Sequence, residues 1–367
     1  MNGPDILDQN RNLLANLIME RGNDIPRFAP LNINPWLASS LLQKAIRRGR
    51  EDLALGAAAT LLQTSPDRLW RRLCVVSFED VGVADFDTVS LVMAGLTGKH
   101  WRSKNGGEWA VASYLIGRMC RTIKCRATDD LAYVCELHPD YEQARLELIN
   151  KPIPELLEII AGKCALPERA LALWFAIGTH RCRSKVLQER TGDPHGVLDA
   201  LCERGYPETI IEVCRTGLTK SGEIMAPFLI LLWRELQKTT SHSEPDSLPE
   251  EEMIGEVPVW AYDMHTREGK QAIAQFLKMD CETVRWLSGL VPPAKRNHLL
   301  GNMIFSVEGG LVDRRLRWKA GDRLRNMVHI EVGGIAPKDM KEGLELLRID
   351  LPKLNEARRQ VVAENVG

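Results

Sequence analysis

Apolar residues recur every three to four positions along most of the chain, which is the spacing of one buried helical face. In residues 5–21 that face carries Ile6, Leu13, Leu14, Leu17 and Ile18. Alternation of apolar and polar residues, the pattern of a half-buried strand, is scarce. The best strand candidate, residues 327–332, is too isolated to define a sheet. The pattern therefore predicts an all-α fold.

Two dipeptides mark helix starts. In Asn34-Pro35 and Ser65-Pro66, a residue that can cap a helix precedes a proline at the first helical position. We expect helices to begin at residues 35 and 66. Further helices are expected at about 86–96, 107–124, 129–149, 153–163, 167–179, 194–204, 207–216 and 224–238.

The clearest break in the pattern is the stretch 239–257, TTSHSEPDSLPEEEMIGEV. It is polar, acidic and interrupted by prolines, so it reads as a linker with little core to bury. A lesser boundary is expected near residues 151–154. The chain is thus divided into residues 1–150, a middle helical bundle or array over 151–238, the linker 239–257, and a smaller C-terminal helical domain over 258–367.

Composition narrows the function classes. The formal net charge is −1, so any binding to nucleic acid must come from local patches of cations. Nine cysteines at irregular spacing do not suggest a disulfide framework and fit a reducing cytoplasm. The N-terminal residues show no secretory signal pattern, and the longest apolar stretch, 225–233, is about half of what a membrane span needs. We expect a cytoplasmic protein with no membrane contact.

Two neighbouring segments are more specific than an amphipathic pattern. Residues 42–55 read LQKAIRRGREDLAL, and residues 71–85 read RRLCVVSFEDVGVAD. Together they resemble the C-terminal helical region of the MgsA/RarA family, replication-associated ATPases related to Werner-helicase-interacting protein. The second segment departs from the family pattern, because Phe78 is inserted between Ser77 and the Glu79-Asp80 pair. The resemblance covers about residues 35–150, with 108–133 as a weaker continuation.

In that family the region forms a helical collar that supports oligomerisation and action at stalled replication forks. The resemblance therefore implies a collar-like domain in residues 1–150, serving as an oligomerising or docking module. It does not imply ATP hydrolysis, because the best phosphate-loop candidate, Gly98-Lys99-His100, lacks both the first glycine and the hydroxyl residue of that motif. We expect no cofactor. The simpler alternative is a set of amphipathic helices with solvated charged faces.

Basic residues gather in two places that could contact phosphate. The first patch lies in the two segments that resemble the MgsA/RarA family and includes Arg50, Arg68 and Arg72. The second patch lies in the C-terminal part of the chain and includes Lys319, Arg323 and Arg325. Cations beside an aromatic ring suit backbone binding with base stacking, although arginines on an amphipathic helix also pair with glutamates. The candidate nucleic-acid residues are Lys44, Arg47, Arg48, Arg71, Arg314, Arg315, Arg317 and Trp318.

A polar cluster directly after the linker holds Asp263, His265, Arg267 and Lys270. It could bind phosphate, with Asp263 orienting His265 as a general base. The alternative is that Thr266 caps a helix running from Arg267 to Leu277, with the charges at its surface.

A zinc site was also considered, because three cysteines and a histidine follow one another in the series C-x4-C-x9-C-x2-H. Its spacing differs from common zinc motifs, and core cysteines are the better interpretation, so no metal is expected. The residues are Cys120, Cys125, Cys135 and His138.

Three functions follow from these observations. The leading one is a non-catalytic scaffold linked to DNA replication or repair, which self-associates and binds DNA or a replication partner. The second is an enzyme acting on phosphate-bearing or nucleic-acid substrates through residues 263–270. The third is an adaptor that binds only protein, through the apolar helix of residues 227–233.

Overall fold

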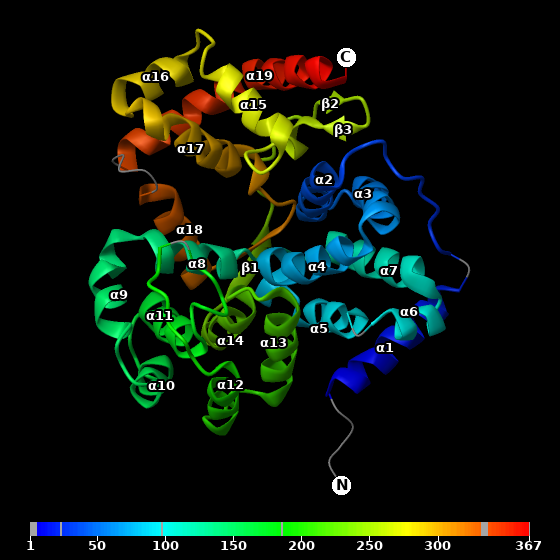
Figure 1. The fold of residues 1–367 in the computed structure, drawn as a ribbon, viewed down its shortest axis with the longest axis vertical. Helices are drawn as coiled ribbons and strands as arrows, with labels where there is room; N and C mark the ends of the chain where they lie inside the picture. Colours follow the sequence, from blue (N-terminus) through cyan, green and yellow to red (C-terminus); the bar gives the residue numbers. More distant parts are fainter. Residues whose placement is uncertain (1–5, 23, 97, 185, 332–336, 367) are drawn as a thin grey trace. The chain divides into compact units, whose positions relative to one another are not determined.

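The all-α prediction is confirmed. The computed structural model describes residues 6–22, 24–96, 98–184, 186–331 and 337–366, and within them nineteen α-helices are joined by short turns and four short strands (Figure 1). The residues group into two compact units. The first comprises residues 1–26, 70–244 and 315–328, and the second comprises residues 27–69, 245–314 and 329–367.

The first unit holds most of the helices. They are α1 (Ile6–Arg21), α5 (Phe86–Gly95), α6 (Lys99–Lys104), α7 (Gly107–Arg121), α8 (Ala127–Leu137), α9 (Glu142–Leu148), α10 (Ile153–Ala161), α11 (Leu166–Ile177), α12 (Pro194–Glu203), α13 (Glu208–Ser221) and α14 (Met225–Leu236). Two helices, α4 (Pro66–Val76) and α18 (Lys319–Glu331), contain the positions where one unit gives way to the other along the chain. α11 and α14 form the apolar centre, with every residue from Ala170 to Ile177 and from Met225 to Leu232 buried.

The second unit contains α2 (Pro35–Arg47), α3 (Glu51–Thr64), α15 (Arg267–Phe276), α16 (Glu282–Leu290), α17 (Pro293–Ile304) and α19 (Pro337–Val366). α2 packs along α3, whose buried face is largely alanine and so permits close approach of the two backbones. α15, α16 and α17 pack against α19 around a core that includes Phe276, Leu300 and Leu354.

These units differ from the sequential domains that the sequence predicts. Residues 27–69 belong with the C-terminal helices rather than with the rest of 1–150, and no boundary lies near residue 151. The passage from Glu244 to Pro245 between units does fall inside the predicted linker. Composition along the chain cannot reveal contacts between segments that lie far apart in sequence, which is why it missed this division.

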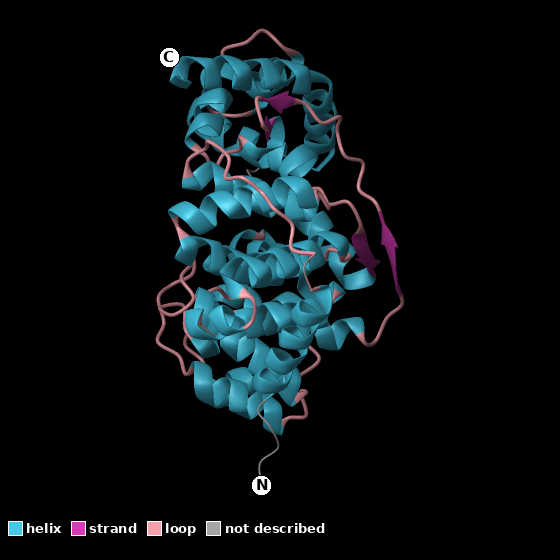
Figure 2. Ribbon diagram, turned by 90° about the vertical axis from the view of Figure 1, so that its right-hand side faces the viewer, coloured by secondary structure: helices cyan, strands magenta, loops and turns pink. Residues whose placement is uncertain are grey.

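Short strands lie in the stretch predicted to be a linker. β1 (Ser241–Glu244) pairs antiparallel with β4 (Arg315–Trp318), and β2 (Met253–Ile254) pairs with β3 (Val257–Pro258) (Figure 2). The strand expected at residues 327–332 is wrong over 327–331, because α18 continues to Glu331. Residue 332 lies outside the described residues. Leu324 and Met327 are three positions apart on α18 and line the same pocket, as residues on one helical face do. Packing of this helical face therefore outweighs the local preference for a strand.

The helix starts at residues 35 and 66 are confirmed. α2 begins at Pro35, and the Asn34 side chain accepts hydrogen bonds from the backbone amides of Trp36 (3.0 Å) and Leu37 (2.9 Å). α4 begins at Pro66. These local signals need only a few neighbouring residues, and so the sequence alone reveals them.

We predict that Asn34→Ala lowers the free energy of unfolding by about 1 kcal/mol, because two amides of the first turn lose their acceptor. Asn34→Ser, which keeps a capping oxygen, should lie much closer to the parent protein. Urea titration followed by circular dichroism measures both. Equal stability of the alanine and serine variants would contradict the capping role.

Candidate functional site

The segment that resembles the MgsA/RarA family contains an unusual turn. After α4 the helix widens into a π-helical turn, η1 (Ser77–Val81), followed by a 3-10 turn, η2 (Gly82–Ala84), and then by α5. A π-turn closes its hydrogen bonds between residues i and i+5, so it contains one more residue than an α-turn. The inserted Phe78 lies in this turn and is buried.

A buried arginine holds the turn in place. The Arg126 guanidinium donates to the carboxylates of Glu79 (3.0 Å), Asp80 and Asp129. Arg126 is 3% exposed and Asp80 is fully buried. Burial alone lowers the pKa of Arg126, but the surrounding carboxylates outweigh it and raise that pKa well above its ordinary value. The cluster is an ion-paired clamp in which one guanidinium binds three carboxylates.

Backbone contacts complete the clamp. The Cys125 amide donates to the Asp80 carbonyl (2.8 Å), and the Thr128 hydroxyl donates to the Phe78 carbonyl (2.6 Å). Gly82 has a φ of +53°, and a Cβ there would lie 2.5 Å from the Cys125 carbonyl oxygen. Only glycine fits both the conformation and this close approach.

In the second unit, the cations of α2 point into the fold. The Lys44 ammonium lies 2.6 Å from an Asp263 carboxylate oxygen, and both side chains are 4–5% exposed. Although burial by itself raises the pKa of Asp263, Lys44 outweighs it and holds that pKa below its ordinary value. Burial lowers the pKa of Lys44, and Asp263 opposes this only in part.

The two arginines that follow are also used internally. Arg47 donates to the Gly309 carbonyl (2.8 Å) and lies over the Phe305 ring. Arg48 donates to the Glu308 carbonyl (2.9 Å) and lies over the Trp260 ring. The Glu308 carboxylate in turn accepts from Arg358 of α19, with both side chains buried.

Most of the predicted nucleic-acid residues are therefore not at the surface. Lys44, Arg47 and Arg48 are 3–8% exposed, and their donors face partners within the fold. Arg315 and Trp318 are also buried, at 6% and 2% exposure. A buried guanidinium cannot meet a phosphate and a buried indole cannot stack on a base, so the DNA-contact prediction needs correction at these five positions.

Three of the predicted residues keep exposed groups. Arg71 is exposed on α4, and the Arg314 side chain is 48% exposed. The Arg317 side chain is 32% exposed and pairs with Glu244 and Asp322, each at 2.7 Å. These residues do not form one compact cluster within either unit, since Arg71 and Arg317 belong to the first and Arg314 to the second.

The proposed catalytic cluster is divided between the core and the surface. Asp263 faces Lys44 in the core, whereas His265, Arg267 and Lys270 are exposed. The capping alternative is confirmed, because the Thr266 hydroxyl accepts from the Gly269 amide (3.0 Å) at the start of α15. The Asp263 carboxylate accepts from the His265 backbone amide (3.0 Å).

The remaining two expectations concern cysteines and an apolar helix. Among the described residues no group of three or more His, Cys, Asp or Glu side chains is arranged to hold a metal, and Cys120, Cys125, Cys135 and His138 are buried. Burial raises the pKa of the Cys125 thiol to about 11. The apolar helix proposed as an adaptor surface is core, with residues 227–232 buried in α14.

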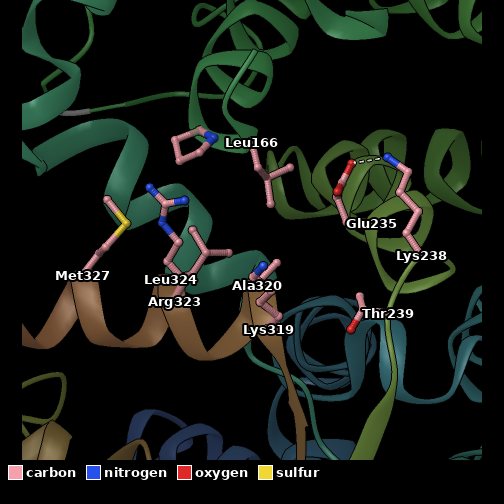
Figure 3. Close-up of a pocket in the computed structure, with 10 residues that line it drawn as sticks. Leu166, Glu235, Lys238, Thr239, Lys319, Ala320, Arg323, Leu324 and Met327 are labelled. Atoms are coloured by element: carbon pink, nitrogen blue, oxygen red, sulfur yellow. Dashed lines mark hydrogen bonds and ion pairs between the residues drawn. The ribbon is translucent and has the colours of Figure 1, made fainter. Parts of the chain in front are cut away.

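Sequence analysis missed an open pocket in the first unit. Its volume is about 340 Å³, and it lies between the start of α11, the end of α14 and one face of α18. Arg323, Leu324 and Met327 extend from α18, and Leu166, Glu235 and Lys238 come from other helices of the unit (Figure 3). The lining residues are Leu166, Pro167, Glu235, Lys238, Thr239, Lys319, Ala320, Arg323, Leu324 and Met327.

The pocket combines an apolar floor with a cationic rim. Lys238, Lys319 and Arg323 are exposed, whereas the one lining carboxylate, Glu235, already accepts from Arg169 (2.7 Å) and Lys238 (2.8 Å). The rim therefore favours a negatively charged ligand. The amphipathic spacing of Arg323, Leu324 and Met327 was the signal in the sequence, but it could not show which other helices lie opposite.

Comparison with known proteins gives no relative. The chain matches no protein-family model, and no curated protein and no solved structure is significantly similar to it. Within the described residues, no helix is both long and apolar enough to span a bilayer. The resemblance to the MgsA/RarA family thus rests on its two segments.

We predict that Asp263→Asn destabilises the protein by roughly 3–5 kcal/mol at neutral pH, because Lys44 keeps its buried position without a counter-charge. The pKa of Asp263 is depressed in the folded state, so its contribution exists above the unfolded pKa of about 3.9 and disappears as pH falls through the lower folded value. The stability difference from the parent should shrink in that acidic range. Chemical denaturation at several pH values measures it.

The double variant Lys44→Met/Asp263→Asn is the control, because it removes both charges and should recover part of the lost stability. A neutral-pH difference near zero for Asp263→Asn, or one that does not change with acidification, would contradict the buried ion pair.

We predict that Gly82→Ala destabilises the π-turn more than Gly222→Ala destabilises the end of α13. Both glycines have positive φ, but only Gly82 has a backbone oxygen where the new Cβ must lie; Gly222 has its nearest atom at 4.0 Å. The control should lose roughly 1–2 kcal/mol from the left-handed backbone alone. Thermal and urea unfolding compare the two, and equal losses would argue against the close approach at Cys125.

Proposed function

We propose that the chain is a non-catalytic helical scaffold of DNA replication or repair, acting in the cytoplasm through self-association and binding of DNA or a replication partner. The observation that carries this proposal is the position of Phe78. The residue that interrupts the family-like pattern lies in the π-turn, and such a turn takes in one additional residue between two helices. This supports treating residues 71–85 as the counterpart of the family segment.

The ionic clusters argue for a scaffold rather than an enzyme. General acid–base catalysis needs a titratable group within reach of a substrate proton. Asp80 and Asp263 are instead buried beside Arg126 and Lys44. His265 is exposed, and the Asp263 carboxylate accepts from its backbone amide while it pairs with the buried Lys44.

DNA binding rests on fewer residues than the sequence predicts. Of the eight candidates, Arg71, Arg314 and Arg317 retain exposed side chains. The cation-rimmed pocket adds Lys319 and Arg323 as exposed positive groups, and it has an apolar floor that a protein segment fits better than a phosphate backbone does. A protein partner is therefore the part of the proposal with the stronger geometric support.

If DNA is a ligand, we expect fluorescence anisotropy to show binding to forked, single-stranded or duplex DNA that weakens steeply with salt. Arg71→Ala/Arg314→Ala should reduce the salt slope by up to about two units, because each phosphate contact contributes nearly one. Lys220→Ala, which removes an exposed cation of α13 outside the candidate set, is the matched control. Absence of salt-dependent binding to all three DNAs would remove DNA from the proposal.

A further inference from the structure

An acidic segment of the second unit carries negative charge, which is complementary to the cationic rim of the pocket. Residues 245–253 read PDSLPEEEM and contain four carboxylates and no lysine or arginine. We call this segment the acidic strap. Two large apolar side chains are exposed on it, Leu248 at 37% and Met253 at 43%.

The strap is held at both ends by its own unit. Near its start, Asp246 accepts from the Val312 amide (3.0 Å). Near its end, Glu251 accepts from Trp260 (3.1 Å) and pairs with Arg50, and Glu252 pairs with Arg359 (2.6 Å). Leu248 and Glu250 lie between these attachments, and both are exposed.

Two prolines limit the freedom of the exposed part. Pro245 and Pro249 each fix one backbone torsion, so the segment between the attachments has fewer conformations to lose when it binds. Reducing that entropy cost favours binding without requiring additional contacts. The exposed Leu248 and Glu250 therefore lie on a segment with restricted backbone freedom.

The pocket offers the complementary features. Its floor is formed by Leu166, Pro167, Leu324 and Met327. Its rim carries the exposed cations Lys319 and Arg323, and Lys238 pairs with the one lining carboxylate, Glu235. A volume of about 340 Å³ lies at the lower end of the roughly 300–1,000 Å³ usual for ligand pockets. That size accommodates one large apolar side chain together with its neighbours.

We propose that the acidic strap of one copy docks in the pocket of a second copy, with Leu248 on the apolar floor and Glu250 at the Lys319–Arg323 rim. The inference rests on the proposed scaffold function and specifies its self-association. Because strap and pocket are different surfaces, the contact is head-to-tail: the copy whose strap is docked keeps its pocket available for a further copy, and the other keeps its strap. Copies can then form rings or chains.

A contact limited to one short segment and one pocket gives a weak association. Interfaces that bury less than about 1,200 Å² are typical of transient complexes. The opposite charges at the rim make the association sensitive to salt. We therefore expect self-association that increases with protein concentration and decreases with ionic strength.

The test uses the full chain and reverses the charge at exposed positions of each side separately, while Asp246, Glu251 and Glu252 keep their contacts within their own unit. One variant carries Lys319→Glu/Arg323→Glu in the pocket, and the other carries Ser247→Lys/Glu250→Lys in the strap; all four positions are exposed. Light scattering and sedimentation over a range of protein concentrations should show at least tenfold weaker self-association for each variant alone. An equimolar mixture of the two should regain it, because each strap then meets a pocket of opposite charge.

A labelled peptide of residues 243–254 provides a second measurement. Its anisotropy should rise when the parent protein is added. Its affinity should be about tenfold lower for the pocket variant than for the parent. Its affinity for Lys220→Glu, a charge reversal on α13, should equal that for the parent. Replacing Leu248 by Ala in the peptide should weaken binding as well, because the apolar anchor is lost. The peptide result does not depend on whether a full-length variant is stable.

Three outcomes would overturn the proposal: a parent protein that stays monomeric at every concentration, variants that associate as the parent does, or a mixture that fails to regain association while both variants keep their helix content. Peptide affinity that does not depend on the pocket charges would overturn it too. Salt-dependent DNA binding by a strictly monomeric protein would overturn this interface and the self-association in the proposed function, and would leave the DNA binding standing. Strap-dependent self-association without DNA or partner binding would support the interface and overturn the link to DNA replication or repair.

Discussion

A charge removed from water must find an opposite charge or a strong dipole inside the protein, and both units of this chain are organised around that requirement. In the first unit, Arg126 gathers Glu79, Asp80 and Asp129 and so fixes the π-turn between α4 and α5. In the second, Lys44 pairs with Asp263 at the entry to α15. Removing Arg126 would take the counter-charge from the buried Asp80 carboxylate, and removing Lys44 would take it from the buried Asp263 carboxylate.

This constraint separates the cations that maintain the fold from those that can act on a ligand. Lys44, Arg47 and Arg48 resemble a phosphate-binding patch in sequence, yet each is committed to a carboxylate, a carbonyl or an aromatic ring nearby. Lys319 and Arg323 are exposed beside an apolar floor. We therefore expect a charged ligand to bind at α18 rather than at α2.

The features that the sequence predicts correctly are those that depend on near neighbours. Helical periodicity, the Asn34 cap and the Thr266 cap each involve residues within a few positions. The partner of Arg47, the Gly309 carbonyl, is 262 residues away, and the pocket is assembled from the start of α11, the end of α14 and α18. A single sequence contains no signal for such pairs, so exposed and buried arginines look alike in it.

The central contrast in this protein is between the buried cations of α2 and the exposed cations Lys319 and Arg323 of α18. Amine-reactive labelling of the native protein, read residue by residue by mass spectrometry, tests this directly. Lys319 should react rapidly, whereas Lys44, at 4% exposure and paired with Asp263, should stay unmodified until the protein unfolds. Labelling of Lys44 as fast as Lys319 under native conditions would contradict the claim.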